Sequence, residues 1–487
     1  MSPWSLREVA QHNSPDSCWV IIHNKVYDVT DFLPEHPGGA KIILKYAGRD
    51  ATSAYDPIHP PDALDKNLDP SKHLGPLDSA SEQTIAHAKD NVKKTKDEIR
   101  VEQARKRMPP LNRILNLQDI EDVAKRVLSH KALAYYASAS DDEITNIENA
   151  RAFNRFFFNG RVMRPVSHCD PSTSILGFKS SIPVFVSGAA LAKLGHPDAE
   201  INITRGAHQG GIIQMVSSNA SLSPASIMEA ADESQALFFQ LYKHRDDAVA
   251  EKRVREIERL GYKAIFLTVD AIVAGNRERD IRSPWVLEEE EVGPVYFKET
   301  HGADKPESDV NIFGTAGALV ANDDRDMTWE KTIPWLRSIT RLPIVIKGEN
   351  YAFDAVLAMD AKVDGILLSN HGGRQLEYSL PPMEVLYSLR RHRPDIFDKL
   401  EVYIDGGVHR GTDVVKAVCL GAKAVGLGRH FLYAQSAYGV SGVSKLVEIL
   451  KREITTAMRL LGASTIADLR PEMLHRVDWQ PAIRGKL

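Results

Sequence analysis

The motif SNHGGRQ places an imidazole and a guanidinium three residues apart, as His371 and Arg374. A histidine near neutral pH can take up a proton, and an arginine can hold a carboxylate through two parallel hydrogen bonds. An ordinary loop histidine between an apolar strand and a glycine pair is the alternative interpretation. The spacing nevertheless indicates a base beside a carboxylate clamp.

Other polar residues end other apolar runs of the chain: Gln240, Tyr242, Thr268, Asp270, Lys347, Asp405 and Arg429. Two of these ends are rich in glycine, DGGV at 405–408 and GLGR at 426–429. Backbone amides at such ends can approach a phosphate, although a single glycine pair can equally be a tight turn. Two such motifs in succession favour a phosphorylated cofactor.

A second candidate site lies near the N-terminus, where His36 directly precedes Pro-Gly-Gly and His59 follows 23 residues later. A lone histidine is more often an ordinary surface or core residue. A b-type haem, however, takes two neutral imidazoles from opposite faces, on separate elements with apolar residues between them. The apolar wall would consist of Ile42, Ile43, Leu44, Tyr46, Ile58 and Leu64.

Eight short apolar runs recur from Pro183 onward, and each ends in a polar residue or glycine. They span 183–189, 212–218, 236–242, 264–270, 343–348, 365–371, 402–408 and 424–429. The segments between them are mostly long enough for a helix, so the pattern predicts an α/β fold, a (β/α)8 TIM barrel. In this fold the carboxyl ends of the strands carry the chemistry, and phosphate sites occur after the seventh and eighth strands. The polar strand ends should therefore meet at one mouth.

The remaining sequence divides into a small domain, a linker, the barrel and a tail. Residues 1–78 predict a compact α+β domain, with strands at 18–22 and 25–29. Residues 79–110 predict a charged, partly helical hinge, because 12 of the 20 residues from 88 to 107 are charged. The barrel spans 111–465, with an insertion near 280–335 that is either a mobile lid or a disordered loop, and 466–487 form a tail.

Composition excludes several classes of function. The net charge of −4 offers no broad basic surface for nucleic acid, and three scattered cysteines suggest neither a disulfide framework nor a thiolate metal site. No apolar run approaches the roughly 18 residues of a membrane span. The N-terminus shows no signal peptide or presequence, and the final Gly485-Lys486-Leu487 is only a weak peroxisomal signal. A cytoplasmic location, or a processed chain, fits this sequence better than a peroxisomal one.

The run from Trp19 through HPGG to LGPL at 74–77 resembles cytochrome b5 domains over about 75 residues. This resemblance implies that His36 and His59 ligate a haem b. Because both axial positions would be filled, such a haem would relay single electrons and would not bind substrate.

Residues 111–465 resemble the FMN-dependent α-hydroxy-acid dehydrogenases and oxidases through the motifs SNHGGRQ, LTVDA, ALAKLGHP and DGGVxRGTD. With the cytochrome b5-like domain ahead of it, the chain is similar to the flavocytochrome b2 family of L-lactate:cytochrome c oxidoreductases. The resemblance implies FMN and haem b, oxidation of an L-2-hydroxy acid, with L-lactate the first choice, and cytochrome c as acceptor. It also implies a homotetramer in which the tail wraps a neighbour, and a mitochondrial intermembrane-space location.

The same resemblance assigns residue roles. His371 would be the base, with Asp270 orienting it, while Arg374 and Tyr135 would hold the substrate carboxylate. Tyr242 would hydrogen-bond the hydroxyl oxygen, with Arg277 at the same end of the substrate. Lys347 would lie beside the flavin pyrimidine edge. The other cofactor contacts implied are Ala190, Ser217, Gln240 and Thr268 at the ring, and Asp405, Gly406, Gly407, His409, Gly428 and Arg429 at the phosphate end.

Three positions depart from the family pattern: Asn219 stands where an apolar or aromatic residue is usual, His409 replaces the first arginine of DGGVRRG, and Ala139 replaces the glycine of YYASGA. Asn219 keeps two alternatives open, an oxidase that uses oxygen and a dehydrogenase for a bulkier or more polar 2-hydroxy acid. His409 predicts weaker or pH-dependent FMN binding. A non-catalytic flavin-binding barrel is disfavoured because His371, Asp270 and Arg374 are all present.

Overall fold

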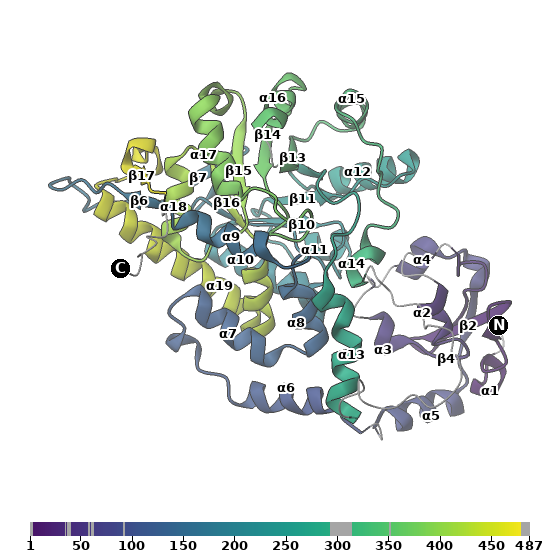
Figure 1. Ribbon diagram of the computed structural model, residues 1–487. Helices are drawn as coiled ribbons and strands as arrows, with labels where there is room; N and C mark the ends of the chain where they lie inside the picture. Colours follow the sequence, from purple (N-terminus) through teal and green to yellow (C-terminus); the bar gives the residue numbers. More distant parts are fainter. Residues whose placement is uncertain are drawn as a thin grey trace, which may run out of the picture.

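The computed structural model describes residues 3–34, 36, 40–56, 59, 63–90, 93–292, 314–349 and 352–478. Its larger part is a closed barrel of eight parallel strands, so the predicted fold class is confirmed (Figure 1). Each predicted apolar run contains one strand. The strands are β9 (Val184–Val186), β10 (Ile213–Ser217), β11 (Leu237–Leu241), β12 (Ile265–Thr268), β13 (Ile344–Glu349), β14 (Gly365–Leu368), β15 (Glu401–Asp405) and β16 (Ala424–Leu427).

Every strand is followed by a helix that packs on the outside of the barrel: α10 (Ala199–Gly210), α11 (Pro224–Glu229), α12 (Asp247–Leu260), α15 (Trp329–Ile339), α16 (Ala352–Asp360), α17 (Pro382–His392), α18 (Gly411–Cys419) and α19 (Arg429–Leu461). The strands are buried on both faces, which explains why their sequences read as continuous apolar runs without alternation. β16 pairs in parallel with β9 and closes the sheet.

Two apolar layers hold the barrel together. The outer layer fills the space between strands and helices, and the inner one consists of side chains that point into the barrel, including Phe185, Phe238, Phe266, Leu367 and Tyr403. A hairpin of β7 (Thr173–Ile175) and β8 (Phe178–Ser180) adds Ile175 to the inner layer. The backbone amide of Leu176 in this hairpin donates to Glu401 at the start of β15, so the hairpin closes the amino-terminal end of the barrel. Only the carboxyl-terminal mouth remains for a ligand.

Three helices precede the barrel strands and reach its mouth: α7 (Leu117–Val127), α8 (His130–Ala137) and α9 (Ile144–Phe153). The segment predicted as a charged hinge contains α5 (Ser79–Asp90) and α6 (Lys96–Lys106). α6 is tied to the barrel domain, because Asp97 accepts a hydrogen bond from the His130 amide at 2.9 Å and Arg100 donates to the Leu128 carbonyl. After α19, β17 (Leu474–Arg476) returns to pair with β6 (Phe156–Phe158). The end of the predicted tail, 479–487, lies outside the described residues.

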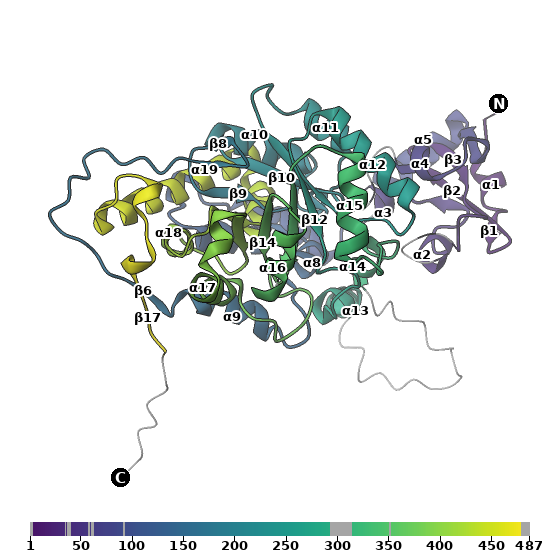
Figure 2. The same cartoon turned by 90° about the horizontal axis from the view of Figure 1, so that it is seen from above.

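The N-terminal domain lies to one side of the barrel in both views (Figures 1 and 2). Its sheet contains β1 (Asn13–Ser14), β2 (Ser17–Ile22), β3 (Lys25–Asp28) and β5 (His73–Pro76), with β4 (Arg49–Asp50) added beside β2. β2 and β3 match the two strands predicted from the sequence. Short helices surround the sheet: α1 (Leu6–Val9), α2 (Ala40–Leu44), α3 (Thr52–Tyr55) and α4 (Ala63–Asn67).

The insertion between β12 and β13 contains α13 (Glu278–Val292) and α14 (Gly314–Leu319), while 293–313 lie outside the described residues. α13 packs against α8 and α6, and the described residues 320–328 after α14 are irregular. Cys18, Cys169 and Cys419 are free thiols, and burial raises the pKa of Cys18 to about 11 and of Cys419 to about 12.

Among the described residues, no helix has both the length and the apolar character that crossing a bilayer requires.

Candidate functional site

The loop after β14 presents His371 to the barrel mouth in an uncommon backbone conformation. His371 has a φ of 59°, and Gly372 and Gly373 follow at 65° and 76°. A left-handed φ is costly for a residue with a side chain, and such strain persists where the surrounding structure enforces it. Here the His371 amide donates to Ser369 Oγ at 3.1 Å, and the Gly373 amide donates to Asn370 Oδ1 at 3.0 Å. The loop is therefore locked with its imidazole facing inward.

His371 lies between a carboxylate and a phenol. Its Nδ1 is 3.1 Å from Oδ1 of Asp270, which follows β12, and its Nε2 is 3.3 Å from the hydroxyl of Tyr242, which follows β11. An imidazole that donates from Nδ1 to a carboxylate keeps its Nε2 lone pair free. The ends of β11, β12 and β14 thus assemble a base with a supporting carboxylate.

The electrostatics fix the protonation states of this pair. Burial alone would raise the pKa of Asp270, but the positive charge of Lys347 at 3.7 Å and the His371 hydrogen bond hold that pKa below its usual value. Burial and the charge of Lys347 lower the pKa of His371, against the opposing effect of Asp270. Burial also raises the pKa of Tyr242 well above normal. At neutral pH Asp270 is therefore charged, His371 is a neutral base and Tyr242 keeps its proton.

A cationic group lies beside this base. One terminal nitrogen of Arg374 donates to the carbonyls of Tyr135, Tyr136 and Ser138 at 3.0, 3.1 and 2.7 Å, and the guanidinium lies 5.3 Å from the centre of the Tyr135 ring. Arg277 donates to the Arg374 carbonyl at 3.2 Å, and burial together with the nearby Arg374 lowers the pKa of Arg277 to about 9. The buried guanidinium of Arg277 and the half-buried guanidinium of Arg374 together form a site for an anion.

The residues predicted to meet a flavin ring come together at the ends of β9 to β13. Ala190, Ser217 and Lys347 line the barrel cavity. Gln240 and Thr268 lie behind this lining, with Gln240 Nε2 donating to Thr268 Oγ1 at 3.0 Å. The amide oxygen of Gln240 is buried and has no partner among the described residues, so it can accept a hydrogen bond from a ring N–H. The buried acceptor and the buried Lys347 ammonium fit the polar edge of a flavin.

The ends of β15 and β16 form the predicted phosphate region. Gly407 has a φ of 78°, and a side chain there would meet the Asn149 carbonyl oxygen at 2.2 Å, so this turn requires glycine. A side chain at Gly428 would meet nothing within 4 Å, which shows that this glycine faces open space. Arg429 is anchored to Asn146 and to the Gly372 carbonyl, both at 2.7 Å. Exposed amides and a fixed guanidinium fit a phosphate.

These groups surround one cavity of about 540 Å³. Among the predicted site residues, its lining includes Tyr135, Ala190, Ser217, Tyr242, Arg277, Lys347, His371, Arg374, Asp405, Gly406, Gly407, His409, Gly428 and Arg429. Three further predicted site residues do not line the cavity but lie behind its wall: Asp270, Gln240 and Thr268. Asp405 also accepts a hydrogen bond from Ser187 at 3.0 Å. The cavity therefore brings the predicted barrel site together, while the role of each residue stays a prediction.

Sequence reasoning missed several cavity residues, above all Glu121, Asn146 and His430. Glu121 and Asn146 lie on α7 and α9, before the first barrel strand, and no local pattern indicates that these helices reach the mouth. His430 follows the predicted Arg429 directly, and its position after a glycine-rich strand end was the available signal. Burial, with the nearby His409 and Arg429, lowers the pKa of His430 to about 3.

The departures from the family pattern fall at different places. Asn219 lines the cavity and is half-buried. Ala139 is 1% exposed, and its backbone is not left-handed, so its methyl group introduces no strain beside Tyr135. Burial lowers the pKa of His409, which keeps its imidazole neutral near pH 7.

The two predicted haem ligands also meet. The imidazole rings of His36 and His59 face each other with centroids 6.0 Å apart and planes inclined by 31°. Since an imidazole nitrogen binds a metal at about 2 Å, this gap accommodates one metal ion between the rings. His59 Nδ1 lies 3.1 Å from the Tyr55 carbonyl, which fixes the proton on Nδ1 and leaves Nε2 for a metal. Ile43, Leu44, Tyr46 and Leu64 pack against the domain core. The Ile42 side chain is 45% exposed, and Ile58 lies outside the described residues.

One helix connects the two sites. α8 carries Tyr135, which lines the barrel cavity. One turn earlier it carries Lys131, whose pKa is lowered by partial desolvation and by the charge of Lys45 in the N-terminal domain. The N-terminal domain therefore lies close enough to α8 for the charges of Lys45 and Lys131 to interact.

The comparisons with known proteins agree with this geometry. A family model described as FMN-dependent dehydrogenase matches residues 124–476, and one described as cytochrome b5-like haem/steroid binding domain matches 5–78. The L-lactate dehydrogenase (cytochrome) of Wickerhamomyces anomalus is 44% identical over 96% of this chain and 78% of its own length. A glycolate oxidase of Oryza sativa subsp. indica is 39% identical over 74% of this chain and 95% of its own.

Among solved structures, a double mutant of flavocytochrome b2 with pyruvate bound is 42% identical, with a TM-score of 0.70. The match covers 79% of this chain and 92% of that structure.

Proposed function

The chain belongs to the FMN-dependent dehydrogenase family, with a cytochrome b5-like domain ahead of the barrel, and from this premise we propose that it oxidises L-lactate to pyruvate. It is an oxidoreductase whose cofactors are FMN and haem b. The observation that carries the proposal is the neutral His371, supported by Asp270 and placed beside Arg374 in one cavity. The dehydrogenase relative matches 96% of the chain, whereas the oxidase relative matches 74%, without a counterpart for the haem domain.

The chain's own residues account for binding and proton transfer. Oxidation of a 2-hydroxy acid to a 2-oxo acid removes two electrons and two protons from the carbon and its hydroxyl group. Arg374 and Tyr135 bind the carboxylate, and the hydroxyl oxygen takes the place beside Tyr242. Nε2 of His371 accepts one of the protons, and Asp270 stabilises the resulting imidazolium.

FMN held in the barrel cavity would supply a two-electron acceptor, and haem b held by His36 and His59 would supply transfer of single electrons. Lys347 places a buried positive charge next to the site of the flavin ring. This charge would stabilise the negative charge of a reduced, anionic flavin. Lys45 of the N-terminal domain lies near enough to Lys131 on α8 for their charges to interact, which supports a short distance between the two cofactor sites. We propose cytochrome c as the acceptor, because a haem that His36 and His59 would both hold would supply one-electron transfer and would not bind a substrate.

A spectroscopic experiment tests this function. The purified protein, loaded with FMN and haem, is mixed without oxygen with L-lactate, glycolate, L-mandelate and L-malate in turn. We expect L-lactate to bleach the flavin first and to reduce the haem afterwards. Turnover is then compared with cytochrome c and with oxygen as acceptor. Equal rates with the two acceptors would contradict the relay role of the haem domain.

Replacing Asp270 by asparagine should change the pH dependence in a direction that the electrostatics fix. The neutral form of His371 is active, so activity is lost as the pH falls through its pKa, which lies below the usual value. Asp270 raises that pKa, so Asp270→Asn should move the acid limb of kcat/KM to lower pH, while kcat falls by about 10²- to 10⁴-fold. An acid limb that stays in place or moves to higher pH would contradict the proposed pair.

A more polar 2-hydroxy acid is the second candidate substrate, because Asn219 lines the cavity. Asn219→Leu should shift the ratio of kcat/KM values for L-lactate and L-malate toward L-lactate by about 10-fold or more, since apolar contacts of this size contribute about 1–3 kcal/mol. Asn219→Ala removes the amide without adding apolar volume. Comparing it with Asn219→Leu therefore separates the effect of losing the amide from the effect of gaining apolar volume. A ratio that neither substitution changes would exclude Asn219 from substrate selection.

The assembly and the location of the protein are separate proposals. We propose a homotetramer in the mitochondrial intermembrane space, on the strength of the family resemblance. Light scattering of the purified protein tests the tetramer, and fractionation of source cells tests the location. A monomer in solution, or recovery with cytosolic markers, would contradict the respective proposal.

A further inference from the structure

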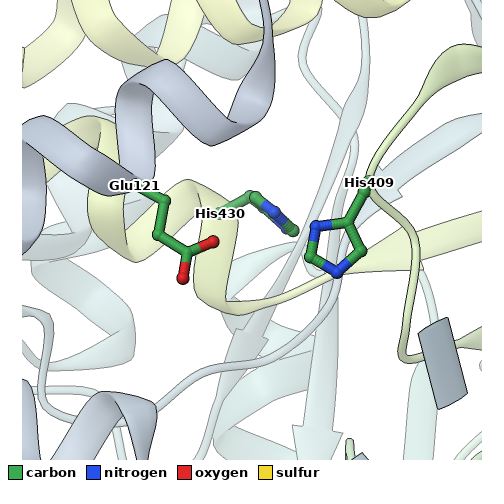
Figure 3. A group of neighbouring side chains, drawn as sticks. All are labelled: Glu121, His409 and His430. Carbon is green, nitrogen blue, oxygen red and sulfur yellow. The ribbon is translucent and has the colours of Figure 1, made fainter. Parts of the chain in front are cut away.

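Three potential metal ligands meet at the edge of the cavity, away from His371 and from the haem ligands. Glu121 comes from α7, His409 follows β15, and His430 lies at the start of α19. One ligand atom from each lies within 4.8 Å of the others. Figure 3 shows the Glu121 carboxylate and the two imidazoles converging on the same space. Three elements distant in the sequence thus supply two imidazoles and one carboxylate.

The hydrogen bonding of His430 is incomplete in a way that indicates a ligand. Its Nε2 atom is buried and has no hydrogen-bond partner among the described residues. Buried imidazole nitrogens normally have a partner, so one without a partner calls for an ion or another group. The ring of His409 stands edge-on to it, with centroids 5.2 Å apart and planes at 89°, so the two imidazoles do not stack.

Two imidazoles and one carboxylate are a ligand set for zinc and similar divalent transition metals. We propose that Glu121, His409 and His430 bind one such ion, with zinc as the best match, at a site separate from the catalytic pair and the haem. All three residues line the cavity, so the fourth coordination position faces it. Lys125 pairs with Oε1 of Glu121 at 2.7 Å, which leaves the other carboxylate oxygen for the metal.

A phosphate bound by the two histidines without a metal is the competing explanation. Glu121 argues against it, because a carboxylate among phosphate ligands adds repulsion unless a cation lies between them. Arg429 and the Gly406–Gly407 backbone remain available for a phosphate. Tetrahedral coordination with bonds of about 2.0–2.1 Å brings ligand atoms to about 3.3 Å from one another, so the side chains must close slightly on the ion.

Elemental analysis of the intact holoenzyme tests the site. Protein carrying FMN and haem is treated with a chelator, equilibrated with micromolar zinc, and separated from free metal by gel filtration. We expect one zinc per chain in addition to the haem iron. Zinc K-edge absorption should show the scattering pattern of two imidazoles. Absence of stably bound zinc, or a spectrum without imidazole ligands, would overturn the proposal.

Two variants locate the ion, and one matched substitution controls for general effects. Glu121→Gln and His430→Asn should each abolish stoichiometric zinc binding, while His475→Asn, an exposed histidine on β17, should retain it. The haem and flavin spectra of each variant report whether it has folded. Zinc retained by both folded site variants would overturn the assignment of the three ligands. If a variant fails to fold, the zinc content of the wild-type protein still tests whether the site binds a metal.

Discussion

Replacing His371 by glutamine should lower kcat for L-lactate by about 10²- to 10⁴-fold, the usual contribution of a positioned base. Glutamine retains a polar side chain of similar length but cannot take up a proton at neutral pH. The phosphate region around Arg429 and Gly407 is built by other strand ends, so FMN content should not change. The rate of flavin bleaching in an anaerobic stopped-flow experiment measures the effect directly.

Binding and folding are the controls for this substitution. Arg374 and Tyr135 are unaltered in His371→Gln, so pyruvate should still bind and perturb the flavin spectrum. His208→Gln changes a half-exposed histidine that does not line the cavity and should leave kcat unchanged. A His371→Gln enzyme that retained more than about a tenth of wild-type kcat would rule out a base role for His371.

Replacing His59 by alanine should separate the two halves of the reaction. Without the second imidazole the 6.0 Å arrangement of His36 and His59 is lost, so haem occupancy should fall from near complete to near zero. L-Lactate should still bleach the flavin at close to the wild-type rate, because none of the described residues of the N-terminal domain lines the barrel cavity. Reduction of cytochrome c should fall to the background rate. Absorbance at the haem and flavin bands follows both events in one experiment.

His23→Asn is the matched control in the same domain. The His23 side chain is 60% exposed and pairs with Asp56, so its replacement should leave the haem spectrum and cytochrome c reduction intact. Ferricyanide, a small acceptor that can reach the flavin, should still support turnover in His59→Ala. Full cytochrome c activity in a haem-free variant would show that electrons leave the barrel directly.

The sequence predicted those parts of the molecule that depend on local patterns. Buried parallel strands require continuous apolar runs, so all eight barrel strands could be located, and with them the polar residues at their ends. His371, Asp270 and Tyr242 follow three different strands, yet the barrel topology alone requires them to meet at one mouth. The His36 and His59 pair was equally visible because the HPGG motif is specific.

Other features depend on packing that no local pattern records. Glu121 and Asn146 reach the cavity because α7 and α9 lie across its mouth. Arg374 is fixed by three carbonyls of α8 and the residue after it, and these partners lie more than two hundred residues earlier in the chain. The insertion was predicted from its length and its acidic run, but the packing of α13 on α8 and α6 depends on surfaces formed elsewhere. Gln240 and Thr268 were placed at the correct strand ends, but they lie one layer behind the cavity wall.

The pairing of β9 with β16 has a consequence for biosynthesis. The flavin cavity is lined by residues that directly follow β9 and by residues of β16, so it is incomplete until the ribosome has released the last barrel strand. The haem ligands, by contrast, lie in a domain that is synthesised before the barrel, and domains generally fold as units during translation. The order of synthesis therefore allows haem to be captured before flavin. A chain interrupted before β16 would carry an electron carrier without a source of electrons.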